Sequence, residues 1–230
     1  MKKHMIKCVI FDLDNTLIDS FEVHLRSYRR ILEEFGVRVR KKDFATRYGM
    51  RLREIAASML PQKYHDKIGY VVKKKKKMFE RDIKKVKLFP DTRRTLSALR
   101  KMGFKLGIAS SANSRTVRKI MRLFKMNGYF DFIVGGNDVK NGKPAPDVLF
   151  EAARYCARDM RGAREGARGL GACVKECVYV GDTPIDADAA RGARMKFIGV
   201  STGIHTKKQL ARYGDRVVRK LGDVIKLVEN

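Results

Sequence analysis

Five short apolar runs, each followed directly by polar or glycine residues, constrain the fold of this chain more than any other feature. The runs are rich in β-branched and aromatic residues, which favours strands that are buried on both faces. Segments with apolar residues at helical spacing lie between them. Strands that alternate with helices predict a parallel α/β sheet covered by helices on both faces. The runs are residues 6–11, 104–109, 130–134, 177–180 and 196–200, and the helical segments are residues 92–102, 114–126, 146–157 and 184–193.

The alternation stops between residues 19 and 88, where no strand candidate of similar quality occurs. The simplest interpretation is an all-helical insert after the first strand. We therefore expect residues 1–18 and 89–230 to form the α/β core and residues 19–88 to form a separate helical domain. Helical spacing continues there through residues 21–35, 52–60 and 64–83.

The charge of the chain is strongly positive, because 52 Lys and Arg oppose 25 Asp and Glu, for a net charge of +27. Residues 20–88 contain 21 Lys and Arg against 8 Asp and Glu, so about half of the excess lies in the insert. A basic surface attracts phosphorylated metabolites, nucleic acid or acidic membranes, and the charge alone does not choose among them. The lysine run at residues 73–77 is interpreted as a solvated helix face.

Other features exclude several classes of protein. No stretch approaches 18 to 20 consecutive apolar residues, and the N-terminal apolar run is too short for a signal peptide, so we expect a cytoplasmic protein without a membrane partner. The four cysteines are too few and too scattered for a disulfide framework. Cys173 and Cys177 have no matching partners nearby in the sequence, so no metal site is predicted there. The scattered histidines (His4, His24, His65 and His205) receive no catalytic role, and the glycine-rich residues 161–171 are expected to form a loop or a frayed helix.

Two carboxylates, Asp12 and Asp14, follow the first predicted strand. Side chains two residues apart in extended backbone point the same way, and like charges this close raise one pKa unless a cation intervenes. Such a pair indicates a metal site, a carboxyl group that acts as an acid, or both. The alternative is an Asx turn, which needs only one Asp.

A second acidic group follows the fourth strand. Asp182 lies at the turn into a helix that begins at Pro184, and Asp186 falls in the first helical turn. An acidic cluster that satisfies the helix dipole is the alternative, and Asp188 is assigned to it as a solvated residue.

Two further residues have phosphate-binding chemistry. Ser110 follows a strand and precedes a helix whose free N–H groups can bind an anion, although it could equally serve as a helix cap. Lys143 stands before two prolines that stiffen its loop and fix its direction, although these prolines could simply start the next helix.

Together, these residues resemble the four motifs of the haloacid dehalogenase superfamily. Asp12-Leu13-Asp14-Asn15-Thr16 is similar to the first motif, Ser110 to the second, Lys143 in Gly-Lys-Pro-Ala-Pro to the third, and Gly181-Asp182-Thr183-Pro184-Ile185-Asp186 to the fourth. The resemblance covers nearly the whole chain and favours the subgroup of phosphoglycolate phosphatases and β-phosphoglucomutases. It implies a Rossmann-like three-layer core with a helical cap that selects the substrate.

The resemblance also implies residue roles. Asp12 would attack phosphorus, and Asp14 would act as the general acid and base. Mg²⁺ would bind the Asp12 carboxylate, the Asp14 backbone carbonyl and Asp182. Asp186 would orient Lys143 or a water on the metal. The other implied roles concern phosphate and substrate: Ser110, Lys143, Asn113 and the backbone amides near Leu13 and Ser111 would bind the phosphoryl group, and Arg51 and Arg53 in the cap would bind the leaving group.

The expected function is therefore a Mg²⁺-dependent phosphatase that releases phosphate from a small phosphorylated metabolite, as a monomer or homodimer. A mutase is an alternative within the same family, because it uses the same phosphoaspartate with a cap that excludes water. A nucleic-acid-associated protein that uses its basic insert is an alternative from another class, although no nucleic-acid motif occurs.

Overall fold

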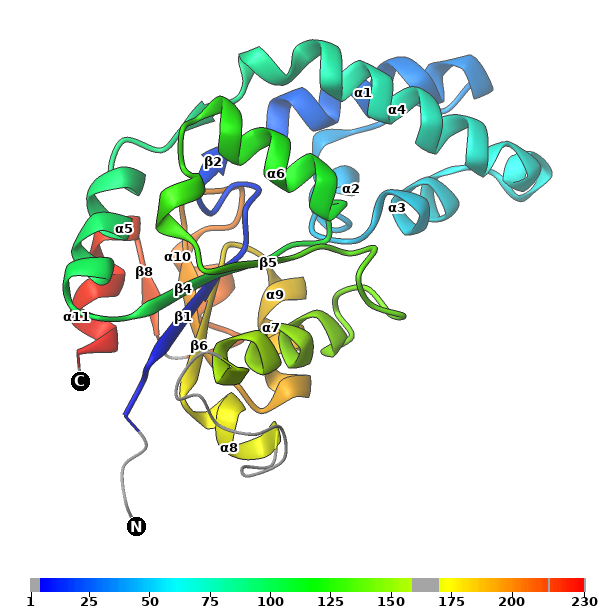
Figure 1. Ribbon diagram of the computed structural model, residues 1–230. Helices are drawn as coiled ribbons and strands as arrows, with labels where there is room; N and C mark the ends of the chain where they lie inside the picture. The colour runs from blue at the N-terminus through cyan, green and yellow to red at the C-terminus, as the bar shows by residue number, and fades with distance from the viewer. Residues whose placement is uncertain (1–4, 159–169, 215, 230) are drawn as a thin grey trace.

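The computed structural model describes residues 5–158, 170–214 and 216–229. Its main sheet is parallel and has the strand order β5-β4-β1-β6-β7-β8 (Figure 1). The expected fold class, a parallel α/β core with an inserted helical segment, is confirmed. Short β8 was not predicted, since a two-residue strand carries no periodicity. The strands are β1 Cys8–Phe11, β4 Lys105–Ala109, β5 Phe132–Val134, β6 Cys177–Gly181, β7 Lys196–Val200 and β8 Val217–Val218.

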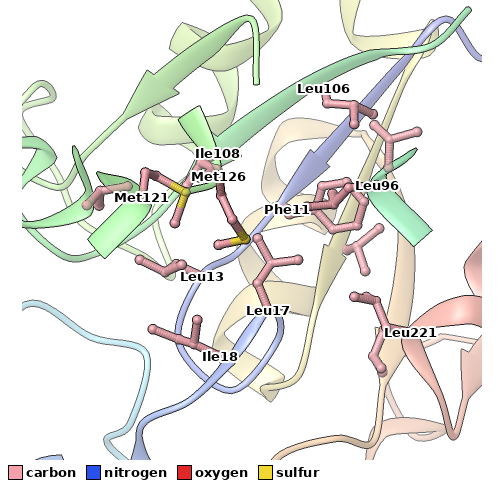
Figure 2. Packing of buried hydrophobic residues seen from close by; sticks show 14 of the residues in the cluster. Phe11, Leu13, Leu17, Ile18, Leu96, Leu106, Ile108, Met121, Met126 and Leu221 are labelled. Carbon is pink, nitrogen blue, oxygen red and sulfur yellow. The ribbon is translucent and has the colours of Figure 1, made fainter. Parts of the chain in front are cut away.

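The central strand β1 explains the layers of the core. Its side chains alternate between the two faces of the sheet, as the strand geometry requires. Val9 and Phe11 join one buried cluster, which Figure 2 shows, and Cys8 and Ile10 join a second cluster on the other face. The first cluster is covered by α5 Thr92–Lys101, α6 Ser114–Leu123, η4 Asn127–Tyr129, η5 Leu221–Asp223 and α11 Val224–Val228, and the second by α7 Asp147–Arg158, α8 Leu170–Lys175 and α9 Pro184–Ala193.

A helical segment, which we call the cap, lies between two short antiparallel strands, β2 Ile18–Asp19 and β3 Lys87–Leu88. It has an apolar cluster of its own, and Figure 1 shows α1 and α4 side by side in it. Phe79 of α4 and Ile83 of η3 pack instead in the first core cluster. The elements of the cap are α1 Phe21–Leu32, η1 Glu33–Phe35, α2 Lys41–Ala45, α3 Leu52–Met59, η2 Gln62–Lys67, α4 Ile68–Asp82 and η3 Ile83–Lys85.

The remaining described segments add little to the site. A short helix, α10 Lys207–Leu210, packs beside β7 and β8. Most of the glycine-rich stretch at residues 161–171 lies outside the described residues, and α8 begins at Leu170. Within the described parts of the chain, no helix combines the length and apolar character needed to cross a membrane.

Candidate active site

Three predicted site residues follow three neighbouring strands at the same edge of the sheet. Asp12 follows β1, Ser110 follows β4 and Asp182 follows β6. The parallel register aligns these ends, because Phe11 pairs with Ile108 on one side and with Val180 on the other. Residues about 70 and 170 positions apart in the sequence are therefore brought to one edge, where ligands bind in open α/β sheets.

Lys143 lies at the centre of this edge and is 1% exposed. Its Nζ donates to Asp12 Oδ1 at 2.7 Å, to Asp186 Oδ1 at 2.6 Å and to the Tyr179 hydroxyl at 2.9 Å. All three protons of the ammonium group thus have acceptors. Burial alone would lower the pKa of Lys143, but the two carboxylates outweigh it and raise that pKa above its ordinary value. The lysine is held charged beside Asp12.

Asp186 reaches Lys143 because the start of α9 is locally fixed. Thr183 Oγ1 accepts from the Asp186 backbone N–H at 3.1 Å, and Asp186 Oδ2 accepts from the Thr183 N–H at 3.1 Å, which makes a capping box. A Cβ at Gly181 would lie 2.6 Å from Asp186 Cβ, so only glycine fits there. The arrangement leaves Asp186 Oδ1 for Lys143.

The carboxylates of this edge form a buried group of hard oxygen donors. One carboxylate oxygen from each of Asp12, Asp182 and Asp186 lies within 4.8 Å of the others. Burial raises the pKa of Asp12 to about 7 against the opposing effect of Lys143, and burial with the neighbouring Asp186 and Asp12 raises that of Asp182. In both carboxyl groups, burial outweighs the opposing effect of Lys143.

Asp182 provides the observation that tests a metal at this position. Its Oδ1 accepts from Thr16 Oγ1 at 3.3 Å, but its buried Oδ2 has no hydrogen-bond partner among the described residues. A Cβ at Gly203 would lie 2.0 Å from that oxygen, so only glycine fits beside it. Carboxylate oxygens are the ligands that Mg²⁺ prefers. Asp12 and Asp182 therefore fit a magnesium ion, whereas both carboxylate oxygens of Asp186 already accept hydrogen bonds, Oδ1 from Lys143 and Oδ2 from Thr183.

Asp14 faces the cap. Its Oδ1 accepts from Ser20 Oγ at 2.6 Å and lies 3.3 Å from His24 Nε2. Burial by itself raises the pKa of Asp14, but His24, Ser20 and Lys75 outweigh it and lower that pKa to about 2. The two aspartates of the first motif therefore occupy different environments, one beside Lys143 and one beside the cap.

Two cap residues that the sequence analysis left without a role reach this site. His24 Nδ1 lies 2.6 Å from Lys75 Nζ, and the His24 ring stacks on Phe79 with 4.5 Å between ring centroids. The interpretation of the lysine run as a solvated face was wrong for Lys75, which is 2% exposed. A usable signal was present, because Val71 and Phe79 stand four residues before and after it on the same helix face.

The predicted phosphate-binding residues lie at the mouth of the cap. Ser110 Oγ is buried and accepts from the Ala112 N–H at 3.1 Å, and Ser111 Oγ donates to the Gly49 carbonyl of the cap. Asn113 caps α6 by accepting from the Arg115 N–H at 2.9 Å. The side chain of Leu13 is buried in the apolar core, so only its backbone can face a ligand.

The cap arginines are placed differently from the prediction. Arg51 donates to the backbone carbonyls of Val139 and Lys140, both at 2.8 Å, and so ties the cap to the core loop that leads to Lys143. Arg53 is exposed. Neither side chain is among the described residues that line the cavity between cap and core, and their role with the leaving group stays a prediction. Arg47 donates to the Asp43 carbonyl at 2.7 Å, within the cap.

A cavity of about 80 Å³ lies between the cap and the core edge. The core contributes Asp12, Asp14 and the serines after β4, and the cap contributes mostly apolar and aromatic side chains together with His24 and Lys75. A small molecule with one anionic end fits this polarity. The cap residues that line it include Tyr28, Phe44, Tyr48, Gly49, Met50, Leu52, Ile55, Lys76, Phe79 and Glu80.

The chain is similar over nearly its whole length to proteins that are named phosphatases and pyrophosphatases. The chain is 28% identical over 226 residues to a phosphoglycolate phosphatase of Aquifex aeolicus, which covers 98% of both proteins. It is 27% identical over 225 residues to the pyrophosphatase PpaX of Halalkalibacterium halodurans, with 97% of each covered.

Solved structures agree on the fold. A haloacid dehalogenase-like hydrolase from Bacteroides fragilis, described as putative in its name, superposes with a TM-score of 0.80 at 29% identity and covers 95% of this chain and 99% of its own. A β-phosphoglucomutase from Clostridium difficile reaches a TM-score of 0.80 at 19% identity, over 97% of each chain, which shows the fold alone. The sequence profile of the family described as "Haloacid dehalogenase-like hydrolase" matches residues 9–200 of this chain. This match confirms the resemblance seen in the motifs, and the chain belongs to the haloacid dehalogenase-like hydrolase family.

Proposed function

We propose that this protein is a Mg²⁺-dependent phosphatase that releases phosphate from a small phosphorylated metabolite through a phosphoaspartate at Asp12. The observation that carries the proposal is the convergence of Asp12, Lys143 and Asp182 on one buried edge. The names of the relatives, a phosphoglycolate phosphatase and a pyrophosphatase, support small substrates that carry a second negative charge.

Asp12 is the nucleophile in this proposal. Lys143 holds its Oδ1 and fixes the carboxylate toward the cavity. The carboxylate attacks phosphorus, a new O–P bond forms, and the bond from phosphorus to the leaving alcohol breaks. Asp12 and Asp182, with the Asp14 backbone carbonyl, would hold Mg²⁺, which when bound reduces the repulsion between the carboxylate and the phosphate dianion.

Asp14 moves the protons. It gives a proton to the leaving alcohol, and as a carboxylate it then takes one from the water that attacks the phosphoaspartate. The lowered pKa of Asp14 suits the second step, because an ionised carboxylate can accept the proton of the attacking water. In the first step the arriving phosphate is a neighbouring negative charge, which favours protonation of Asp14.

Lys143 and Ser110 bind the phosphoryl oxygens in this proposal. Charge spreads over these oxygens in the transition state, and the positive charge of the ammonium group and the Ser110 hydroxyl stabilise it. To donate directly to a phosphoryl oxygen, Lys143 gives up one of its three present acceptors. Both side chains are buried before substrate arrives, so their hydration is already lost.

A phosphate-release assay tests the proposal. We expect phosphoglycolate, pyrophosphate and hexose phosphates to be distinguished, with turnover that requires Mg²⁺ and is abolished reversibly by EDTA. The Asp12→Asn protein, whose side chain has nearly the same size, is the inactive control. Conversion of β-glucose 1-phosphate to glucose 6-phosphate without phosphate release would assign a mutase instead. Undiminished turnover by Asp12→Asn would exclude the proposal.

A further inference from the structure

All four cysteines of the chain meet in one apolar layer, on the face of the sheet covered by α7, α8 and α9. All are free and buried. With four cysteines among 230 residues, such a grouping is not explained by a general need for small apolar side chains, which alanine and valine meet elsewhere in the same layer. The site described above uses none of them.

Three of these thiols face one another. The Sγ atoms of Cys8, Cys156 and Cys177 all lie within 4.8 Å of one another. Cys8 and Cys177 are register partners in the neighbouring parallel strands β1 and β6, so their side chains leave the sheet on the same face. Cys156 comes from α7, which packs on that face (Figure 1). The sequence analysis missed this group because the register joins residues 169 positions apart.

We propose that Cys8, Cys156 and Cys177 form a binding site for one soft divalent cation of the Zn²⁺ class. Thiolate ligands lie about 2.3 Å from zinc, so three of them around one ion are about 4 Å apart. The present spacing of the sulfur atoms allows this with small side-chain shifts. On binding, each of the three thiols releases its proton to solvent and forms one sulfur–metal bond, and no oxidation occurs.

Charges of both signs lie near the group. One divalent ion with three thiolates carries a net charge of −1. The ammonium group of Lys105, on β4, whose Nζ is buried, and the carboxylate of Glu176 both act electrostatically on Cys156, with opposite signs. In the metal-free protein, the backbone carbonyl of the fourth cysteine, Cys173, accepts from Cys177 Sγ at 3.2 Å, and this hydrogen bond is lost when Cys177 releases its proton.

This site is separate from the catalytic edge. Cys8 and Cys177 open β1 and β6, whereas Asp12 and Asp182 follow the ends of the same strands, about 13 Å and about 17 Å further along at the rise of a strand. The donors also differ, since sulfur selects soft ions and the carboxylates select Mg²⁺. A bound ion would join β1, β6 and α7, the three elements next to the catalytic carboxylates and Lys143, without contact with the substrate.

Cadmium titration of the full chain tests the proposal. The protein is kept reduced with a phosphine, and excess Mg²⁺ is present to occupy the carboxylate edge. Cd²⁺ is followed by thiolate-to-metal charge-transfer absorption and by elemental analysis after gel filtration. We expect one Cd²⁺ per chain, competition by Zn²⁺ and a higher Tm with either ion. Cys156→Ser and Cys177→Ser should each weaken binding at least about tenfold, because each removes one thiolate ligand.

Two controls make the result decisive. Cys173→Ser removes a buried cysteine of the same layer outside the group of three, and it should keep the charge-transfer band. Asp182→Asn should keep it as well. If a serine variant does not fold, X-ray absorption of the Zn²⁺-loaded wild-type protein replaces it, with three sulfur neighbours expected. A wild-type protein without the band, a shell of oxygen only, or binding lost in Asp182→Asn would overturn the proposal.

Discussion

Among the residues that the structure describes, the core and the cap each bury one lysine, and the pKa of that lysine shifts in opposite directions in the two regions. In the core, Lys143 donates to two carboxylates and a tyrosine hydroxyl, and its pKa is raised. In the cap, Lys75 lies against His24 and over the rings of Tyr28 and Phe79, and burial lowers its pKa to about 7. The two side chains are almost equally buried, at 1% and 2% exposure.

The charge of Lys143 is therefore fixed near neutral pH, whereas the charge of Lys75 can change. Lys143 stays charged across the physiological range, as a group that must bind phosphoryl oxygens requires. Lys75 is near its midpoint at neutral pH, so its charge responds to whatever enters the cavity that it lines. We infer that Lys143 supplies a constant charge in the core and that the charge of Lys75 in the cap adapts to the ligand.

Removal of the core lysine should have the largest effect. Lys143→Met leaves Asp12 and Asp186 buried without their cation, which should lower the free energy of unfolding by about 3 to 5 kcal/mol. Loss of the phosphoryl ligand should reduce kcat by about a thousandfold. Urea unfolding and phosphate release measure the two effects. The control is Lys140→Met, which changes an exposed lysine on the same loop. Equal changes in the free energy of unfolding and in kcat for both variants would contradict the role given to Lys143.

Removal of the cap lysine should change how stability depends on pH. Between pH 7 and pH 9 the unfolded chain holds a proton on Lys75 that the folded protein has largely lost, so the free energy of unfolding rises with pH in this window. From pH 7 to pH 9, the free energy of unfolding of the wild-type protein should therefore rise by about 2 kcal/mol more than that of Lys75→Met. Lys77→Met, exposed on the same helix, should run parallel to wild type. Parallel curves for Lys75→Met would show that Lys75 keeps its ordinary pKa.

The contact between the two regions should give the smallest effect. Arg51→Ala removes two hydrogen bonds from the cap to the carbonyls before Lys143, and kcat/KM should fall about tenfold because the closed arrangement is less stable. Arg53→Ala is the matched control, since that exposed side chain stands two residues away. An equal loss in both variants would indicate a general electrostatic effect of the cap.

The core was easier to predict than the cap, for a physical reason. Buried strands and helix caps are local signals, so helix α9 and strand β7 begin and end where the sequence indicated. The residues of the core edge follow strand ends, and parallel register brings those ends together. The cap lacks such a rule: the contact of His24 with Asp14 and the burial of Lys75 depend on how helices pack across one another. The hydrogen bonds of Arg51 to the core loop depend on the same packing, and they could not be read from the sequence.

The roles of the catalytic residues and the division at residues 18/19 and 88/89 stay predictions. Limited proteolysis at these two junctions would test the division. The residue roles depend on one claim, that Asp12 carries the phosphoryl group during turnover.

Trapping of that intermediate tests the claim most directly. The Asp14→Asn protein keeps a side chain that can contact Ser20 but lacks the base for the second step. With Mg²⁺ and p-nitrophenyl phosphate, whose leaving group needs no acid, it should accumulate one phosphoryl group per chain. Mass spectrometry after acid quench should place this group on Asp12, and hydroxylamine should remove it. A phosphoryl group on another residue, or none under conditions of measurable turnover, would contradict the account.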